Sequence, residues 1–289
     1  MKFIPGIVSA ILFYQIILMT DRYKMRKPLP YLTTALIISL NIGTTNAEDA
    51  VAPAAEPASA HTITGNLGFV SDYRFRGISQ TAKRPAVQGG FDYAHASGLY
   101  AGTWASNVSG YSYTDANMEW DFYGGYNDKL SDDIGLTAGG LYYLYPGGKT
   151  GNGKRWDTFE LNFGGNWKWV SGKVWYSVTD FFGASDPKSK GSTYIEANAS
   201  FPFADLKLGN AWLDKLTLVG HLGHQTVKHY SDFSYSDWKL GATYDFNGYI
   251  LGAAYIDTNA KKSAYTLATN RGDKYIGSST IVLSVSKTF

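Results

Sequence analysis

The sequence predicts an all-β fold, a transmembrane antiparallel β-barrel of about twelve strands, and three observations support it. Apolar and polar residues alternate along most of the chain after residue 62. Short turns alternate with longer polar connections between these segments. The chain ends on an apolar row that finishes with an aromatic residue, Phe289. This combination is typical of barrels whose strands face lipid on one side and an interior on the other.

Composition supports a membrane protein and excludes several functional classes. Charged residues make up 17% of the 289 residues, whereas an average soluble domain carries about 25%. Cysteine is absent, which excludes disulfides and thiolate metal sites. Residues 1–47 hold five basic residues and one acid, leaving 21 of the 26 basic and 23 of the 24 acidic residues, a net charge of −2. This balance does not indicate a nucleic-acid partner.

The first 47 residues are predicted to be a targeting segment. Met25-Arg26-Lys27 is a basic start, residues 31–42 are mainly apolar, and Thr45-Asn46-Ala47 offers the small residues that a signal peptidase reads. We expect cleavage after Ala47 and translation from Met25. The earlier apolar run, residues 3–19, could instead belong to a long signal or a membrane anchor.

The segment between the signal and the barrel is predicted to be a linker. Residues 48–61 are rich in alanine and proline and have no apolar periodicity, which indicates a disordered segment. We expect the barrel to occupy residues 62–289.

Alternation with a period of two defines the expected strands. Between residues 118 and 126, Met118, Trp120 and Phe122 share one face, whereas Glu119 and Asp121 share the other. The first segment is too long for one crossing of about 9–11 residues. We expect it to bend near residues 71–72 or to project from the membrane. The expected strands cover residues 62–78, 86–95, 99–108, 118–127, 134–145, 157–169, 173–182, 192–201, 215–225, 236–246, 249–258 and 279–289.

The connections predict the orientation of the barrel. Long polar connections alternate with short turns, and only residues 202–214 break the pattern on the short-turn side. Short periplasmic turns with long external loops are typical of outer-membrane barrels, so we expect both termini in the periplasm. The ring must close because lipid offers no hydrogen-bond partner to a strand edge. A soluble barrel would alternate too, but its polar face would carry abundant lysine and glutamate rather than glycine, asparagine, serine and threonine.

The last strand and the long connections indicate two kinds of partner. Phe289 ends the apolar row and is the expected signal for the barrel-assembly machinery. Many basic residues fall in long connections, where we expect contact with lipopolysaccharide phosphates around the external rim. These residues are Lys83, Arg84, Lys149, Lys154, Arg155, Lys188, Lys190, Lys228, Lys261, Lys262, Arg271 and Lys274.

Two motifs that could carry chemistry are weak. Residues 148–154 match the start of a phosphate-binding loop, but Arg155 replaces the required hydroxyl residue and a strand follows instead of a helix. His221 and His224 lie three residues apart on an expected strand, so they point to opposite faces and cannot chelate a metal together. We expect no metal, no cofactor and no catalytic site. An outer-membrane hydrolase remains an alternative and would need a serine near one of these histidines.

Several motifs resemble a known family. Residues 71–81 (SDYRFRGISQT), 85–93 (PAVQGGFDY), 98–107 (GLYAGTWASN) and 119–121 (EWD) are distinctive. Through them the chain resembles the TorF family of outer-membrane porins over most of residues 62–289. The resemblance implies a porin-like barrel in the bacterial outer membrane and brings no catalytic residues.

A twelve-stranded ring lies between filled eight-stranded barrels and open porins, so any pore is expected to be narrow. We expect passive diffusion of small polar solutes; the alternatives are the hydrolase and a purely structural or adhesive barrel. Charges on the interior face would either pair to stiffen the barrel or form a constriction that filters solutes. The expected pore-lining residues are Asp72, Arg74, Arg76, Asp92, Glu119, Asp121, Glu160, Lys168, Glu196, Asp237, Lys239 and Asp245.

Overall fold

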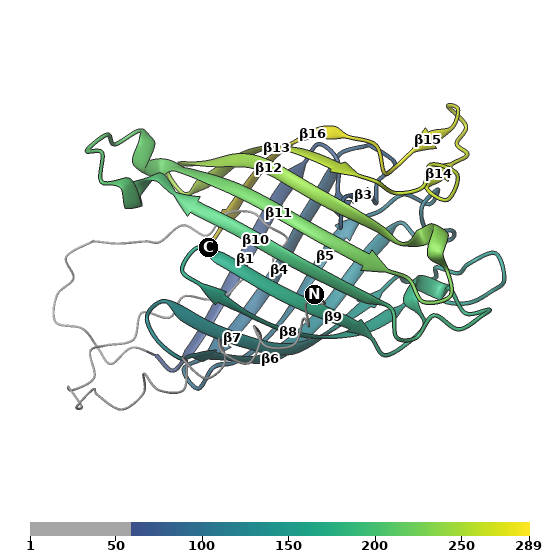
Figure 1. Cartoon of the computed structure of the whole chain (residues 1–289), viewed down its shortest axis with the longest axis horizontal. Helices are drawn as coiled ribbons and strands as arrows, with labels where there is room; N and C mark the ends of the chain where they lie inside the picture. The colour runs from purple at the N-terminus through teal and green to yellow at the C-terminus, as the bar shows by residue number, and fades with distance from the viewer. Residues whose placement is uncertain (1–58) are drawn as a thin grey trace, which may run out of the picture. The chain divides into compact units, whose positions relative to one another are not determined.

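The computed structural model describes residues 59–289, and it confirms a closed antiparallel barrel of twelve strands (Figure 1). The expected signal with its Met25 start and Ala47 cleavage site, and residues 48–58 of the expected linker, lie outside the described residues. The barrel strands are β1 (His61–Val70), β4 (Ala86–His95), β5 (Leu99–Asn107), β6 (Met118–Lys129), β7 (Ile134–Leu144), β8 (Thr158–Trp167), β9 (Val170–Ser177), β10 (Thr193–Pro202), β11 (Leu216–Thr226), β12 (Tyr235–Phe246), β13 (Tyr249–Thr258) and β16 (Thr280–Thr288).

Short elements decorate the connections. Two hairpins, β2 (Arg74–Phe75) with β3 (Ile78–Ser79) and β14 (Thr266–Leu267) with β15 (Lys274–Tyr275), form separate two-stranded sheets. Within residues 59–289 no helix has the length and apolarity needed to cross a membrane. The short 3-10 helices are η1 (Phe181–Gly183), η2 (Phe203–Leu206), η3 (Leu213–Lys215) and η4 (Ser231–Phe233).

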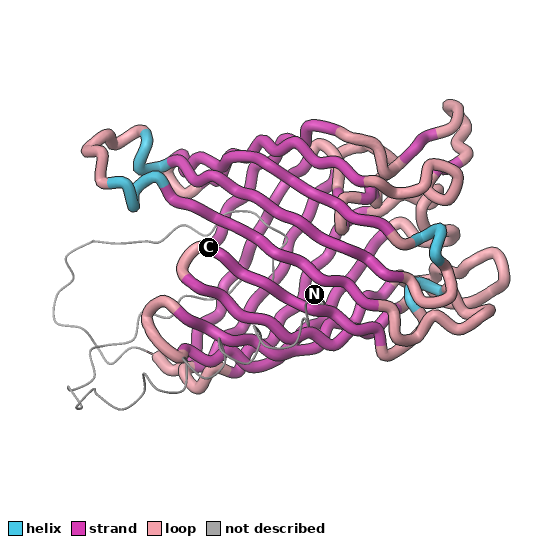
Figure 2. The backbone as a smooth tube through the Cα atoms, viewed as in Figure 1, coloured by secondary structure: helices cyan, strands magenta, loops and turns pink. Residues whose placement is uncertain are grey.

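The two faces of the strands differ as the alternation predicts. The strands run obliquely around the ring (Figure 2), and each pairs with its neighbours in the sequence. Outward side chains are large and apolar: Phe163, Leu222 and Ile281 expose 61%, 66% and 65% of their surface. Inward side chains such as Glu119 and Glu160 are buried. An exposed apolar belt of this kind is stable only in contact with lipid.

The ring closes between the first and last strands. β1 pairs with both β4 and β16, so no strand of the ring is left with a free edge. Beyond β16, the amide of Phe289 donates to the carbonyl of Gly65 over 2.9 Å, and the Gly65 amide donates to the Phe289 carbonyl over 2.7 Å. Closure satisfies the backbone groups that lipid could not satisfy.

Tight turns join strands at the end where the chain terminates. Asn247 and Gly248 connect β12 to β13 with φ of 54° and 81°, as in the type I′ turn that favours Asn-Gly. The turn between β8 and β9 differs from the expectation. It uses Lys168, at φ 50°, with Trp169, rather than residues 170–172, so β9 begins at Val170.

The first expected strand is wrong in its second half. β1 ends at Val70, so the chain does bend near residues 71–72 as expected. Residues 74–79 then form the β2–β3 hairpin instead of continuing the strand. The seventh expected strand, 173–182, also ends early, at Ser177. Asp180 therefore lies in a connection, where its carboxylate accepts hydrogen bonds from the backbone amides of Ser189 and Lys190.

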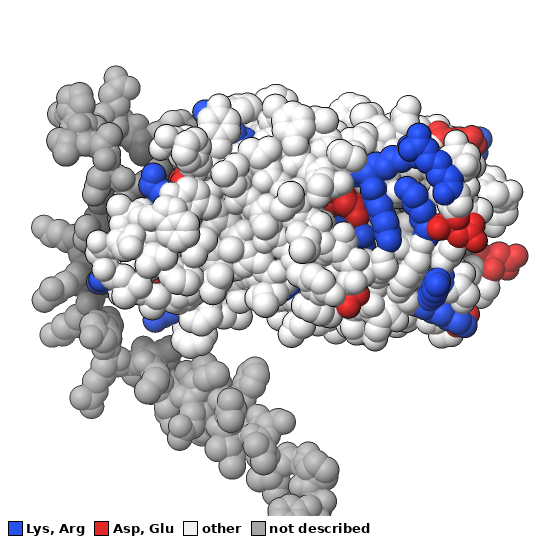
Figure 3. All heavy atoms as spheres, turned by 90° about the horizontal axis from the view of Figure 1, so that it is seen from above, with Lys and Arg blue, Asp and Glu red and all other residues white. Residues whose placement is uncertain are grey.

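Charge is distributed unevenly along the barrel. On the face seen in Figure 3, lysine and arginine side chains gather mainly at the end that carries the long connections, and the middle is almost free of charge. Lys83, Arg84, Lys261 and Lys262 are among the exposed basic residues of these connections. An uncharged band between charged ends matches the layering of a bilayer.

Candidate functional site

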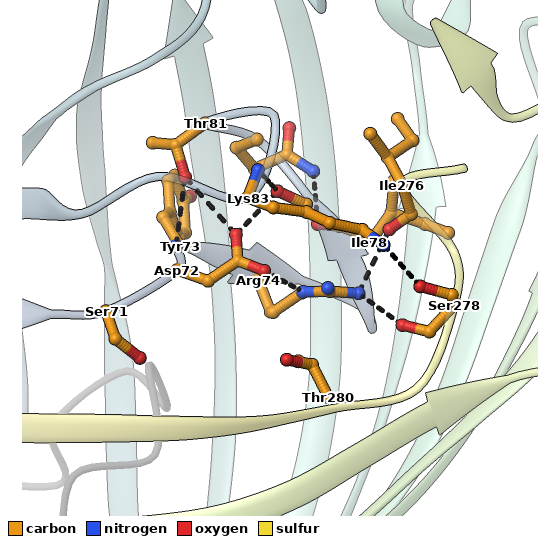
Figure 4. Close-up of polar contacts among 12 residues, drawn as sticks. Ser71, Asp72, Tyr73, Arg74, Ile78, Thr81, Lys83, Ile276, Ser278 and Thr280 are labelled. Carbon is orange, nitrogen blue, oxygen red and sulfur yellow. Dashed lines mark hydrogen bonds and ion pairs between the residues drawn. The ribbon is translucent and has the colours of Figure 1, made fainter. Parts of the chain in front are cut away.

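The β2–β3 hairpin is anchored at its base by an ion pair. Arg74 Nε lies 2.7 Å from Asp72 Oδ2, and both side chains are buried. Arg74 Nη1 donates to the carbonyls of Gly77, Ile276 and Ser278, each over 3.0 Å, so one guanidinium ties the hairpin to the connection before β16 (Figure 4). A planar guanidinium suits this role because its several donors point in fixed directions.

Further contacts hold the segment that returns to β4. Ser79 Oγ donates to Asp72 Oδ1 over 2.5 Å, and Lys83 Nζ donates to Ser278 Oγ over 2.5 Å. Partial burial, together with the positive charges of Arg74 and Lys274, lowers the pKa of the Lys83 amine. Residues 79–83, which follow the hairpin, are therefore attached both to Asp72, just after β1, and to Ser278, in the connection before β16.

The tip of the hairpin reaches the far wall of the barrel. Arg76 Nη2 lies 2.6 Å from Glu160 Oε2 on β8, and Arg76 Nη1 donates to Gln225 Oε1 on β11 over 2.7 Å. Gly77 has φ +77°, and a Cβ placed there would lie 2.5 Å from Thr258 Cγ2 and 2.7 Å from Asp237 Cβ. Only glycine fits this approach. The hairpin thus crosses the interior from β1 and β4 to β12 and β13.

Aromatic side chains pack the interior beside the hairpin. Tyr73 stacks edge-on against Trp104 with ring centres 5.5 Å apart, and Tyr113 stacks on Tyr145 at 4.2 Å. The Tyr73 hydroxyl donates to Glu119 Oε1 over 3.2 Å. These aromatic side chains belong to one buried apolar cluster of the interior.

A cavity of about 200 Å³ remains in the interior. It is lined by the hairpin and by inward residues of both halves of the ring. Drug-sized ligands occupy pockets of roughly 300–1,000 Å³, so this cavity suits a smaller solute. Seven of the twelve expected pore-lining residues border it: Asp72, Arg74, Arg76, Asp121, Glu196, Asp237 and Lys239.

The other five expected residues lie elsewhere. Glu119 and Glu160 face inward but are covered, and Asp92 accepts a hydrogen bond from Tyr123 over 2.5 Å. Lys168 does not line the interior, because it occupies the β8–β9 turn with its amine 3.9 Å from Asp133. Asp245 faces inward at the end of β12 and caps the turn by accepting the Gly248 amide over 2.7 Å.

A polar network lines the cavity wall formed by β10, β11 and β12. His221 Nε2 lies 3.0 Å from Asp237 Oδ1, and its Nδ1 lies 2.6 Å from Asn198 Oδ1. Both ring nitrogens therefore lie within hydrogen-bond distance of oxygen atoms on the neighbouring strands β10 and β12. Tyr194 donates to Asp237 Oδ2 over 2.9 Å. Sequence reasoning considered His221 only as a metal ligand and did not identify Tyr194, although alternation places both on the inward face.

The second histidine faces outward, so the two histidines lie on opposite faces of β11 as expected. His224 Nδ1 lies 2.9 Å from Ser236 Oγ, its cross-strand neighbour. Within residues 59–289, Nε2 of His224 has no hydrogen-bond partner, so the pair lacks the third group that orients a catalytic histidine. The same residues contain no group of three or more histidine or carboxylate side chains placed to hold a metal ion.

The apolar belt, the closed ring and the charged interior define a transmembrane β-barrel of the outer-membrane type. The chain belongs to the Gcw_chp family, which is described as a bacterial protein of unknown function and whose model matches residues 54–289. Bacterial barrels of this type lie in the outer membrane. No curated protein matches the sequence.

Several solved structures are similar to the chain at low identity. One is the KdgM porin in complex with disordered oligogalacturonate, at 8% identity and TM-score 0.46, covering 79% of this chain and 99% of that chain. Another is Acinetobacter baumannii OccAB3, at 12% identity and TM-score 0.39, covering 80% of this chain and 65% of that chain. A third is Pseudomonas aeruginosa OprD, at 13% identity and TM-score 0.35, covering 81% of this chain and 68% of that chain.

Proposed function

We propose that the protein is a narrow porin-like channel that admits small polar solutes by passive diffusion, and that the β2–β3 hairpin forms its constriction. The observation that carries the proposal is the charged cavity between the hairpin and the wall of β10, β11 and β12. A purely structural barrel of this size has no need to keep an interior space lined by seven charged side chains.

The physical basis is a low-dielectric wall with fixed charges of both signs. Selectivity in narrow pores follows from the width and from rings of charged or hydrogen-bonding groups. Here the buried Arg76–Glu160 pair holds the constricting element rigidly, and charges such as Asp121 and Lys239 remain on the cavity surface. A small polar solute can exchange its water shell for these groups.

The orientation and partners belong to the same proposal. Short turns and the chain end share one side of the barrel, which supports a periplasmic location for that side. The exposed basic residues of the long connections would then meet lipopolysaccharide phosphates outside the cell. The aromatic end, Phe289, exposes 69% of its surface and is available to the assembly machinery.

The likeness to TorF porins also supports a channel. Two of the segments that carry it, 71–81 and 85–93, contain most of the inward-folded hairpin and the start of β4. We infer that the chain is a TorF-type porin and that its distinctive motif is the constricting element.

Planar-bilayer recording of the refolded barrel tests the proposal. We expect small, discrete conductance steps, and larger steps when residues 73–80 are replaced by a short glycine–serine linker that still joins β1 to β4. A barrel that folds, migrates normally on a heat-modifiability gel and conducts no ions in either form would overturn the channel function and favour a structural or adhesive role.

A lipid-directed hydrolase is the second candidate, because His224 lies within hydrogen-bond distance of Ser236 on the outer face, although no third group orients the ring. Release of fatty acid from phospholipid by the refolded barrel, abolished in Ser236→Ala and unchanged in Ser284→Ala, would support it. No release above that of the Ser236→Ala variant would reject it.

A further inference from the structure

Asp121 carries a carboxylate with no partner inside the barrel. Its side chain faces the interior from β6, lines the cavity and exposes only 6% of its surface. Its Oδ1 is buried without a hydrogen bond, and within residues 59–289 no donor or cation contacts either carboxylate oxygen. A buried, unpaired carboxylate is costly unless a positive group approaches it.

The acidic and aromatic groups around Asp121 favour the binding of a cation beside it. Glu119 precedes it on the same face of β6 and leaves its own Oε2 without a hydrogen bond. Glu160 is already neutralised by Arg76. The cavity wall also holds the aromatic rings of Tyr73, Phe75 and Tyr143. Aromatic faces attract organic ammonium groups more readily than they bind small hydrated ions.

A lysine, Lys239, faces the same cavity from the opposite side of the ring. Lys239 lies on β12, and in the closed order of the barrel β6 and β12 stand six positions apart in either direction. Within the described residues the Lys239 amine forms no hydrogen bond and no ion pair with a distance below 4.0 Å. His221 is its cross-strand neighbour on β11.

The acids beside Lys239 are already engaged. Glu196 accepts hydrogen bonds from Trp175 Nε1 over 2.8 Å and from Asn198 Nδ2 over 3.1 Å. Asp237 accepts from Tyr194 and faces His221. Lys239 therefore presents an amine without a hydrogen-bond partner beside the carboxylates of Glu196 and Asp237, which attract it, and the β6 wall presents the unpartnered carboxyl group of Asp121.

We propose that the cavity is a binding site for a small zwitterionic solute, with the solute's ammonium group on Asp121 and its carboxylate towards Lys239. The ammonium end can donate to the unpartnered Asp121 carboxyl group and the carboxylate end can accept from the Lys239 amine, so the two contacts together fix the orientation of such a solute. An apolar linker between the two charges fits the apolar wall residues Leu141, Val219 and Ile256. This inference rests on the proposed function and names its solute class.

Calorimetric titration of the refolded barrel in detergent tests the site without any need for conduction. The probes are 4-aminobutyrate, butylammonium and butyrate, which share a linker but carry both charges or only one. We expect 4-aminobutyrate to bind at least about tenfold more tightly than either singly charged probe, since a factor of ten corresponds to about 1.4 kcal/mol. Equal or tighter binding of butylammonium or butyrate would overturn the proposal.

Charge variants assign the two ends of the solute. Asp121→Asn and Lys239→Gln should each weaken 4-aminobutyrate binding about tenfold or more. Lys168→Gln in the β8–β9 turn and Asp245→Asn at the end of β12 are matched controls, because neither borders the cavity, and both should bind normally. Unchanged binding in Asp121→Asn, in a variant with normal heat-modifiable migration, would contradict the assignment.

Current block separates this proposal from the channel function. In bilayers, 4-aminobutyrate should reduce the single-channel current more than the singly charged probes do, and the double exchange Asp121→Lys with Lys239→Asp should restore part of the binding that either single variant loses. A barrel that conducts ions but shows no preference for 4-aminobutyrate overturns the zwitterion site and leaves the channel function intact. A barrel that binds 4-aminobutyrate but conducts no ions supports the zwitterion site and overturns the channel function.

Discussion

Arg76 and Glu160, which lie 84 residues apart in the sequence, face each other as a doubly hydrogen-bonded ion pair inside the barrel. The guanidinium sits at the tip of the hairpin, and the carboxylate belongs to β8. The guanidinium also lies over the ring of Tyr194, 4.3 Å from its centre. A pair of this geometry holds the tip of the hairpin, which we propose as the constriction, against β8.

Removing the cation of this pair should loosen the constriction. Arg76→Ala leaves Glu160 buried without its partner, and breaking a buried pair in this way costs about 3–5 kcal/mol. We expect larger and noisier conductance steps and a lower urea midpoint. Arg155→Ala is the control, because its pair with Asp157 is exposed on the arginine side and should contribute under about 1 kcal/mol. Equal stability losses in the two variants would contradict a structural role for the inner pair.

Gly77 should be far less replaceable than other glycines of similar backbone conformation. Gly77→Ala adds a Cβ within 2.5 Å of Thr258 Cγ2, whereas Gly153, with φ +78°, has open space around it. Both variants carry the left-handed strain of about 1–2 kcal/mol. The additional loss in Gly77→Ala, measured by urea unfolding, reports the contact between hairpin and wall. Similar losses at both positions would show that the hairpin does not press on β12 and β13.

The direction in which a strand residue points should determine how it tolerates charge. Leu283 exposes 57% of its surface on the outer face of β16, and its neighbour Ser284 lines the cavity. Leu283→Arg should cost roughly 2–4 kcal/mol on insertion into lipid bilayers. Ser284→Arg places the same charge in the interior and should fold with a smaller loss. Refolding titrations into vesicles compare them, and the reverse order would refute the register.

The terminal aromatic residue should act in assembly rather than in stability. Phe289→Ala keeps both backbone hydrogen bonds to Gly65, so refolding in detergent should be nearly unchanged. In cells we expect lower outer-membrane levels and periplasmic degradation. Phe289→Tyr, which keeps a ring at the chain end, serves as the control. Normal cellular levels of the alanine variant would show that the machinery does not read this side chain.

The channel should prefer cations weakly. Asp72 is neutralised by Arg74, and Arg76 is neutralised by Glu160. The cavity then keeps three carboxylates against one lysine and one histidine, and carboxylates lower the barrier for cations in a narrow pore. Reversal potentials in a salt gradient measure the preference, which Lys239→Gln should strengthen. A clear anion preference in the wild-type barrel would mean that the arginines dominate the constriction.

Most of the barrel could be predicted because strand alternation is a local property. Each residue of a membrane strand meets either lipid or the interior, so its polarity alone indicates its face. The twelve strands, the faces of Trp120 and Asp121, and the separation of His221 from His224 were all readable in this way. The strand ends were less certain, since Lys168 and Trp169 form a turn although neither residue type favours turns.

The inward hairpin could not be predicted from the sequence, because residues 72–76 alternate charge and ring as a strand does. What distinguishes a hairpin from a strand here is the set of partners: Ile276 and Ser278 for Arg74, Glu160 and Gln225 for Arg76. These partners are far away in the sequence, and closure of the ring brings them together. By itself the sequence determined which side of each strand meets lipid; the tertiary structure alone decided which interior charges pair and which, like Asp121, remain without a partner, because pairing depends on distances across the barrel.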